Sequence, residues 1–191
     1  MKKQLKMVHL SMLAALGVVL MLIVRFPLFP SAPFLEYDMG DVAVILTAFL
    51  YSPWASLLVL VIVSLIQALT VSASSGWIGF VMHVISTGAF VLVCGLIYNR
   101  KRGAKSKVSK LYLPAALAAG TIAMVLVMIP LNLIFTVRFM QVPREAVLNM
   151  MIPTIIPFNV LKGIINSVVV CVLYPAVKKI LKSSKSLNPE L

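Results

Sequence analysis

Apolar segments long enough to cross a lipid bilayer recur along the whole chain, and no other feature of the sequence restricts its fold as strongly. A membrane-spanning helix needs about 20 mostly apolar residues. Segments of this kind occupy residues 7–25, 54–73, 77–98, 111–137 and 153–177. Only 12% of the residues are charged, against about a quarter in soluble domains, and 61% are hydrophobic. The sequence therefore predicts an all-α integral membrane protein.

Residues 42–71 form one apolar run of 30 residues, which is too long for a single membrane helix. At about 1.5 Å per residue it would extend for about 45 Å, whereas the hydrocarbon core of a bilayer is about 30 Å thick. The run is interrupted by Ser-Pro-Trp at residues 52–54, and proline lacks the amide hydrogen that a continuing helix requires. We therefore predict two helices here, at residues 41–51 and 54–73, and six helices in the chain.

Basic residues occur in three patches between or beside the apolar segments. The patches comprise Lys2, Lys3 and Lys6 at the N-terminus; Arg100, Lys101, Arg102, Lys105, Lys107 and Lys110 in a loop at residues 99–110; and Lys178, Lys179, Lys182 and Lys185 in the tail. Cytoplasmic loops of membrane proteins are enriched in such charge. Six helices place all three patches on one side, whereas five would place the loop opposite the N-terminus. The pattern thus favours a six-helix bundle with both termini in the cytoplasm.

The net charge of +12 does not indicate a nucleic-acid partner, because the basic residues are spread among loops. Cys94 and Cys171 lie in apolar segments, where small buried side chains are expected rather than a disulfide. No metal-ligand spacing or glycine-rich phosphate loop occurs. Met7–Val24, at 18 residues, exceeds the h-region of about 7–15 residues in a signal peptide and is expected to be retained. We expect residues 1–191 to form a single membrane domain.

The segment between the first two helices, RFPLFPSAPFLEYDMGD, is apolar and rich in proline. It also holds three of the five acidic residues, Glu36, Asp38 and Asp41. A flexible linker would be richer in Gly, Ser or charge. A stiff apolar loop of this kind is expected to pack over the outer mouth of the bundle as a lid, and an ordinary interfacial loop is the alternative.

The segment IIPFNVLKGIINSVV places an amide and an ammonium inside an apolar helix. Asn159 and Asn166 lie three residues before and four after Lys162, so all three side chains share one helical face. Charged groups at membrane depth usually face a bundle interior or a water-filled cavity. The pattern favours a functional polar stripe over a lysine that snorkels to the lipid headgroups.

Three further polar residues, Asn132, Gln67 and His83, lie in the outer halves or the middle of their predicted helices. Each alone could simply bond a neighbouring helix. Together with Asn159 and Lys162 they predict a pocket that opens outward. The inner halves of the helices are nearly all aliphatic, so the pocket is expected to be closed below rather than to continue as a pore. We take all five as candidate ligand-binding residues.

Two stretches carry a resemblance to a known family. LEYDMGDVAVILTAFLYSPWAS and IIPFNVLKGIINSVV, the second with the motif P-F-N-x-x-K-G, resemble the riboflavin-specific S-components of energy-coupling factor (ECF) transporters. The resemblance covers nearly the whole chain. It implies a six-helix, vitamin-binding subunit of the bacterial plasma membrane that captures its ligand from outside, under the first loop. It also implies a transmembrane coupling protein and two cytoplasmic ATPases as partners.

The resemblance further implies roles for individual residues. It places Asn159, Lys162 and Asn132 against the ligand. On the lid side it places Asp41, Leu35, Tyr37 and Met39. An amide can both donate to and accept from the imide edge of a flavin, and a lysine can donate to a carbonyl or hydroxyl group.

The first helix carries small residues at a spacing that permits close contact with another helix. Ser11 and Ala15 lie four residues apart, with Ala14 and Gly17 beside them. Packing inside the bundle and docking of a partner protein both fit this pattern. The resemblance implies the second, because Ser11 and Ala15 stand where the family has an A-x-x-x-A motif that contacts the coupling protein.

The chain departs from the riboflavin pattern at two places. Val63 and Ser64 stand where the family often has a Lys-Asn pair, and His83 stands where it often has Asn. A related flavin or another vitamin therefore remains an alternative ligand.

Two other classes of function are open to a membrane bundle. An enzyme would need acids beyond Glu36, Asp38 and Asp41, which cluster in one loop without a histidine nearby in sequence. A non-catalytic bundle that binds other membrane proteins would not need the stripe around Lys162. We therefore predict a binding subunit with no catalytic residue and no cofactor, in which riboflavin or a related flavin is the transported ligand and membrane lipid surrounds the chain.

Overall fold

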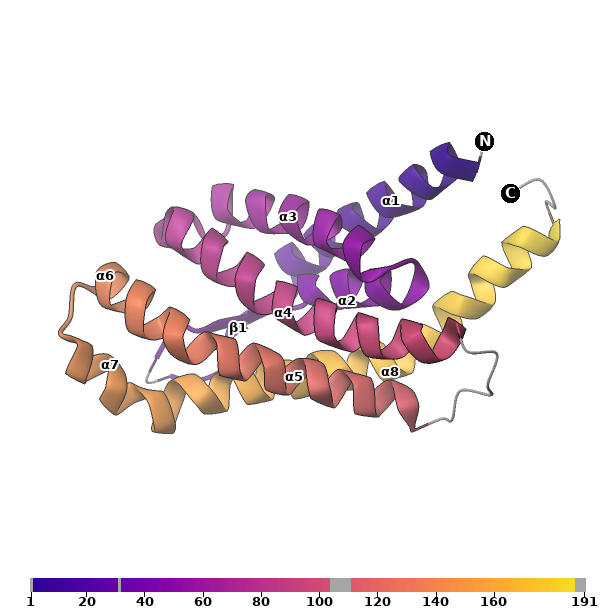
Figure 1. Cartoon of the computed structure of the whole chain (residues 1–191). Coiled ribbons are helices and arrows are strands. Elements are labelled where there is room, and N and C mark those ends of the chain that lie inside the picture. Colours follow the sequence, from indigo (N-terminus) through magenta and orange to yellow (C-terminus); the bar gives the residue numbers. More distant parts are fainter. Residues whose placement is uncertain (1, 31, 104–110, 188–191) are drawn as a thin grey trace.

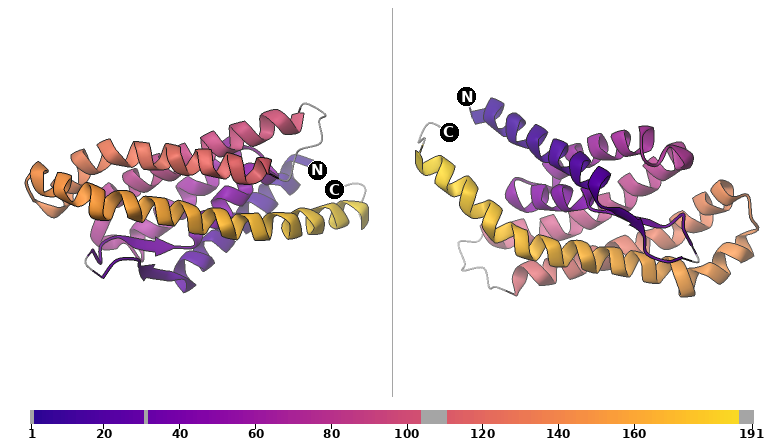
Figure 2. Two further views of the ribbon diagram at one scale, coloured as in Figure 1. Left: turned by 90° about the horizontal axis from the view of Figure 1, so that it is seen from below. Right: turned by 180° about the vertical axis from the view of Figure 1, so that it is seen from behind.

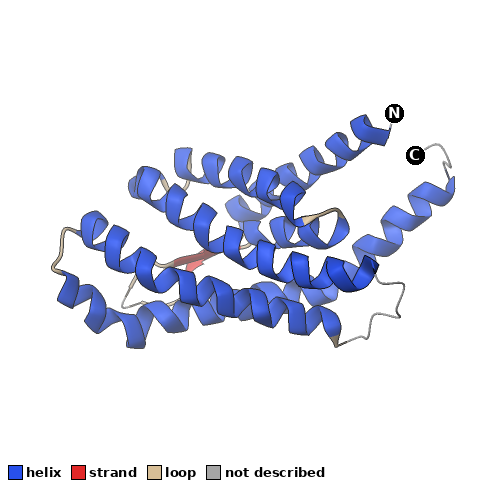
Figure 3. Ribbon diagram, viewed as in Figure 1, coloured by secondary structure: helices blue, strands red, loops and turns tan. Residues whose placement is uncertain are grey.

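The computed structural model describes residues 2–30, 32–103 and 111–187, and it is mostly helical (Figures 1 and 3). Its longer helices are α1 (Lys2–Ile23), α2 (Gly40–Leu50), α3 (Pro53–Leu69), α4 (Gly76–Gly103), α5 (Tyr112–Leu131) and α8 (Ile156–Leu187). Four helical stretches are long and apolar enough to cross a membrane: Gln4–Ile23, Ala73–Arg100, Tyr112–Met140 and Arg144–Ile180. The helices α2 and α3 are apolar but shorter.

The apolar run at residues 42–71 is divided where its proline stands. After α2 ends at Leu50, the side chain of Ser52 accepts a hydrogen bond from the Ala55 amide at 3.1 Å, and Pro53 opens α3. Serine is a favoured N-cap, and proline is favoured at the first helical position because that position needs no amide hydrogen. The ten residues Gly40–Phe49 are all buried, since α2 packs against α1, α3, α4 and α8.

The segment between α1 and α2 contains a short antiparallel ladder, shown in red in Figure 3. Strand β1 (Arg25–Pro27) pairs with β2 (Glu36–Asp38), with Phe26 opposite Tyr37. The all-α prediction missed this ladder, because three-residue strands are too short for an alternating pattern to show in the sequence. Arg25 donates both to Glu36 and to the Val71 carbonyl, so it ties the ladder to the segment after α3.

Helical structure extends further than the sequence predicts at the turn between α5 and α8. The helix α5 continues through η2 (Asn132–Thr136) and α6 (Val137–Met140), and α8 is preceded by α7 (Arg144–Met150) and η3 (Met151–Ile155). Both η2 and η3 are π-helical, and they lie beside or around Pro130 and Pro153. Proline interrupts the regular helical hydrogen bonds, and a local π-turn accommodates the interruption without ending the helix.

The bundle has two distinct ends. We name the end that carries β1–β2 and α6–α7 the hairpin end, and the end at which α1 begins and α8 finishes the terminal end (Figures 1 and 2). A short 3-10 turn, η1 (Ala73–Ser75), connects α3 to α4.

Several basic residues from the sequence analysis lie outside the residues whose side chains are described: Lys2, Lys3, Lys101, Arg102, Lys105, Lys107, Lys110, Lys182 and Lys185.

Two separate hydrophobic clusters stabilise these ends. The main core lies between α2, α3, α4, α5 and α8, with Val44, Leu60 and Phe90 among its fully buried members. The second cluster, at the hairpin end, comprises Ala32, Leu35, Val147, Met151, Ile155 and Phe158. In this cluster the segment between β1 and β2 packs against α7, η3 and the start of α8. The segment is therefore packed and apolar, as a lid requires.

The terminal end is closed by aromatic side chains. Phe49 makes edge-on contacts with Tyr98 and Tyr174, whose hydroxyl oxygens lie 2.9 Å apart. The expectation of nearly all-aliphatic inner halves is wrong here, since these hydroxyl groups are buried. They satisfy one another, which a buried hydroxyl requires.

Candidate functional site

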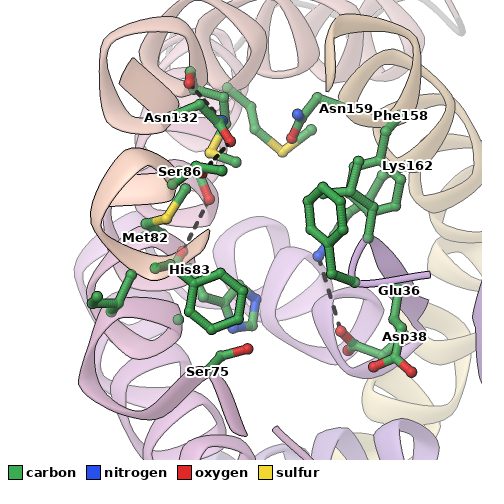
Figure 4. A pocket seen from close by; sticks show the side chains of 18 of the residues that line it. Glu36, Asp38, Ser75, Met82, His83, Ser86, Asn132, Phe158, Asn159 and Lys162 are labelled. Carbon is green, nitrogen blue, oxygen red and sulfur yellow. Dashed lines mark hydrogen bonds and ion pairs between the residues drawn. The ribbon is translucent and has the colours of Figure 1, made fainter. Parts of the chain in front are cut away.

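A cavity of about 160 Å³ lies at the hairpin end, enclosed by the segment after β1, α3, α4, α5–α6 and α8 (Figure 4). Polar residues that line it are Glu36, Asp38, Gln67, Ser75, His83, Ser86, Asn132, Thr136, Asn159 and Lys162. Its apolar wall includes Phe34, Leu35, Met82, Met124, Met128, Phe139 and Phe158. Pockets for small molecules usually measure about 300–1,000 Å³. A ligand with several fused rings therefore requires these walls to move apart.

Lys162 is held by carboxylates inside the bundle. Its Nζ lies 2.9 Å from Asp41 Oδ2 and 3.9 Å from Asp38 Oδ2, and these side chains are nearly inaccessible to solvent. Asp41 occupies the first turn of α2, where the helix dipole favours negative charge. The side chain of Lys162 therefore does not extend to the lipid headgroups in this structure. The amine instead stands at the cavity wall with its charge compensated.

Asp41 joins three helices below the cavity. Besides Lys162 on α8, it meets His83 of α4, whose Nε2 lies 2.8 Å from Asp41 Oδ1. A carboxylate only accepts, so Nε2 carries the proton, and in the neutral ring Nδ1 accepts from the Ser64 hydroxyl at 3.2 Å. Thr87 lies 3.4 Å from both carboxylate oxygens. Asp41, expected on the lid side, lies in the first turn of α2 and pairs with side chains of α4 and α8.

Two amides face the cavity from opposite helices. Asn159 donates from Nδ2 to the Ile155 carbonyl at 2.8 Å, and its Oδ1 has no partner among the described residues. Asn132 donates to the Met128 carbonyl and accepts from the Thr136 hydroxyl, both at 2.8 Å. Asn159 therefore offers a free acceptor in a fixed position, whereas the oxygen of Asn132 is already engaged.

Hydrogen bonds also link β2 to the bundle. The Tyr37 hydroxyl donates to Asn166 Oδ1 at 2.9 Å, and Gln67 donates to Asp38 Oδ2 at 3.0 Å. Burial, assisted by the nearby negative charge of Asp41, raises the pKa of Tyr37 to about 12, so this hydroxyl remains a donor at physiological pH. Since Asn166 lies one helical turn after Lys162, the polar stripe of α8 contacts β2 as well as the cavity.

Six predicted site residues line the cavity together: Asn159, Lys162, Asn132, Leu35, Gln67 and His83. Three others do not line it. Asp41 pairs with Lys162, Tyr37 bonds Asn166, and Met39 precedes α2 and packs against the main core.

The sequence analysis missed the apolar wall and the acids Glu36 and Asp38 as lining residues. One signal for the wall was present in the sequence. Met124 and Met128 precede Asn132 at intervals of four residues, so one face of α5 carries all three. The phenylalanines come from separate segments that only the fold brings together.

The sequence matches the family "ECF transporter, substrate-specific component" over residues 5–174. The chain belongs to this family. The resemblance seen in the sequence is thereby confirmed, and the chain is a multi-pass protein of the bacterial plasma membrane that works with an ECF module and is not an enzyme.

Named relatives of this S-component are similar along nearly its whole length. "Riboflavin transporter FmnP" of Bacillus subtilis (strain 168) is 30% identical over 192 residues, which cover 96% of this chain and 97% of the relative. "Riboflavin transporter RibU" of Staphylococcus aureus (strain TCH60) is 28% identical, with 95% of each chain covered. A solved structure described as "Structure and mechanism of the S component of a bacterial ECF transporter" superposes with a TM-score of 0.78 at 28% identity, over 94% of this chain and 99% of that one.

Proposed function

We propose that this S-component captures riboflavin from outside the cell and holds it in the cavity at the hairpin end. The observation that carries the proposal is the composition of the cavity wall, in which Asn159 and Lys162 stand opposite apolar and aromatic side chains. Riboflavin has the matching chemistry, with a flat ring system, an imide edge and a hydroxylated tail. The names of the similar proteins support the same ligand.

Within this proposal, polar ligand contacts come from the helices. Apolar contacts come from the helices α4, α5, α6 and α8 and, on the lid side, from Phe34 and Leu35. Asn159 pairs with the imide edge through its free oxygen, and Lys162 donates to a carbonyl or hydroxyl of the ligand. Asn132, Gln67, Leu35 and His83 line the rest of the cavity around the ligand. Asp41, Tyr37 and Met39 support these residues without touching the ligand.

The proposed topology is six membrane helices in one domain, with the hairpin end outside and both termini in the cytoplasm. Three exposed basic residues support it: Lys6, Arg100 and Lys179 all lie toward the terminal end. Basic residues are enriched on the cytoplasmic side of membrane proteins. The helix α2 spans only about 17 Å at about 1.5 Å per residue. Its length needs no match to the bilayer, because its first ten residues are buried in protein rather than in lipid.

The proposed partners are a transmembrane coupling protein and two cytoplasmic ATPases. On α1 the small residues divide into two faces. Ala14 and Gly17 are buried, and a Cβ on Gly17 would lie 3.1 Å from Val63, whereas Ser11 and Ala15 are exposed. This separation supports Ser11 and Ala15 as the surface on which the coupling protein docks.

The proposal is tested by titrating riboflavin against the detergent-purified chain, with the fluorescence of the flavin as readout. Saturable quenching is expected, and Asn159→Ala should weaken it. Asn99→Ala is the matched control, because Asn99 bonds the Ala48 carbonyl toward the terminal end. Unchanged fluorescence would contradict riboflavin as the ligand. Equal loss of binding in both variants would instead point to a general effect on the fold.

The departures at Ser64 and His83 give the alternative ligand a specific basis. These two residues bond each other at 3.2 Å, so they form one altered patch beside the cavity. Titration with other flavins and vitamins, on the wild type and on His83→Asn, distinguishes a changed ligand preference from a neutral replacement. A non-catalytic bundle that binds only other membrane proteins would bind none of these compounds.

A further inference from the structure

A smaller hollow adjoins the cavity, between α3, η1 and α4. This side pocket has a volume of about 70 Å³, and its polar lining comprises Ser64, Gln67, Ser72, Ser75 and His83. Gln67, Ser75 and His83 line the cavity as well, so the two hollows share a wall. Figure 4 shows Ser75 and His83 on one side of the cavity, opposite Lys162. The side pocket is therefore within reach of a ligand that occupies the cavity.

The chain between α3 and α4 folds in a way that brings two serines to the side pocket. The Ser72 amide donates to the Gln67 carbonyl, and the Ser75 amide donates to the Ser72 carbonyl, both at 2.9 Å. Gly76 then turns the chain into α4 with a φ of 50°, which glycine adopts readily. At Gly79 a Cβ would lie 2.6 Å from the Ser75 side chain. The missing side chain of Gly79 thus leaves room for Ser75 between the two hollows.

The side pocket contains hydrogen-bonding groups that are not engaged. Gln67 donates from Nε2 to Asp38, so its carbonyl oxygen is left as an acceptor without a partner among the described residues. Within the same residues the hydroxyl groups of Ser72 and Ser75 have no partner either, and a hydroxyl can both donate and accept. One water molecule needs about 10–15 Å³, so the side pocket has room for several hydroxyl groups.

The charge of the side pocket favours a neutral ligand group. Neither lysine nor arginine occurs among the described residues that line it. Arg25 reaches the Val71 carbonyl, next to Ser72, but Glu36 pairs with its guanidinium. Both ring nitrogens of His83 are engaged by other side chains. A chain of neutral hydroxyl groups therefore suits the side pocket better than a phosphate group does.

We propose, on the basis of the proposed function, that the side pocket binds the hydroxylated tail of the flavin while the ring system occupies the cavity. The tail of riboflavin leaves the central ring rather than the imide edge. The imide edge can therefore meet Asn159 and Lys162 while the tail extends toward α3 and α4. Ser64 and His83, at which the sequence departs from the riboflavin pattern, both line the side pocket. Recognition of the tail is thus the step in which this chain differs from that pattern.

Fluorescence titration of the detergent-purified full chain with three flavins tests this assignment. Lumiflavin has the same ring system with a methyl group in place of the tail, and flavin mononucleotide has a phosphate on the tail. The wild type should bind riboflavin about tenfold or more tightly than either, given several hydrogen bonds to the tail. Ser72→Ala/Ser75→Ala should weaken riboflavin binding about tenfold, as expected for two lost hydrogen bonds, and leave lumiflavin binding unchanged.

Two further variants make the test specific. Ala68→Leu fills the side pocket from α3 without removing a hydrogen-bonding group, so it should weaken riboflavin binding and spare lumiflavin binding. Ser74→Ala is the matched control, because Ser74 is exposed in the same turn and lines neither hollow. It should bind all three flavins as the wild type does.

Equal affinity of the wild type for riboflavin and lumiflavin would overturn the assignment, because the side pocket would then hold only water. An equal loss of both ligands in Ser72→Ala/Ser75→Ala would also overturn it, as would tighter binding of flavin mononucleotide than of riboflavin. Failure of the proposed function gives a different result, since none of the three flavins would then bind the wild type, and the assignment would fall with it.

Discussion

The two ends of the bundle bury polar groups in different ways. At the terminal end, the buried side chains Tyr98 and Tyr174 bond each other and pack against Phe49, and all three are neutral. At the hairpin end, Lys162 and Asp41 carry opposite charges beside a cavity. Neutral pairs seal a bundle at little cost, whereas buried charge requires compensation. The comparison indicates that the buried charges of the hairpin end serve ligand binding. The neutral side chains of the terminal end close the bundle.

The largest expected effect follows from removing Lys162. Lys162→Met should lower the free energy of unfolding by about 3–5 kcal/mol, because it leaves Asp41 as an uncompensated buried charge. Thermal unfolding of the ligand-free protein measures the change. Lys162→Met combined with Asp41→Asn should recover most of the stability without recovering riboflavin binding. Full binding by the double variant would show that the charges serve only the fold.

Asn159→Ala should weaken riboflavin binding by about 10- to 100-fold, which corresponds to about 1.4–2.8 kcal/mol and is typical of a buried polar partner left unpaired. Fluorescence titration measures it. Among the described residues, Asn159 forms its hydrogen bond only with its own helical stretch, at the Ile155 carbonyl, so the loss of stability should be smaller than for Lys162→Met. A large fall in the unfolding temperature with unchanged affinity would reverse the assigned role.

Tyr37→Phe tests the lid at the same end. It removes the hydroxyl that bonds Asn166, at a cost of about 0.5–1.5 kcal/mol, so riboflavin should dissociate several-fold faster. Stopped-flow displacement measures the rate. The pKa of Tyr37, about 12, lies above that of a free tyrosine. Its contribution is therefore complete below about pH 10 and lost as the pH rises toward 12, a loss that Tyr37→Phe should not show.

The smallest effect on function is expected at the terminal end. Tyr98→Phe removes one hydroxyl of the pair with Tyr174 and should cost about 0.5–1.5 kcal/mol of stability. Riboflavin affinity should not change, since neither tyrosine lines the cavity. Thermal unfolding and titration on the same preparation give both values. A changed affinity would mean that the two ends are coupled.

Much of the helical layout was accessible from the sequence, because single residues determine it. Length and hydropathy locate the apolar helices, and Pro53 divides a run that no single span could hold. The stripe at Asn159, Lys162 and Asn166 follows from helical spacing, and all three side chains are buried in the structure.

Contacts between distant segments were not accessible in this way. Asp41, His83 and Lys162 lie on three helices, and only the packing of the bundle brings them together. The ladder β1–β2 is too short to leave a periodic pattern. The same limit applies to the second hydrophobic cluster, whose members come from the lid and from α7–α8.

An experimental structure of the chain with riboflavin bound tests the central claim most directly. The ring system is expected at the hairpin end, with its imide edge within hydrogen-bonding distance of Asn159 and with Lys162 beside it. The lid should lie further from α5 than in the structure described above, to admit the rings. Riboflavin bound away from the hairpin end, with the pair of Lys162 and Asp41 undisturbed, would contradict the claim.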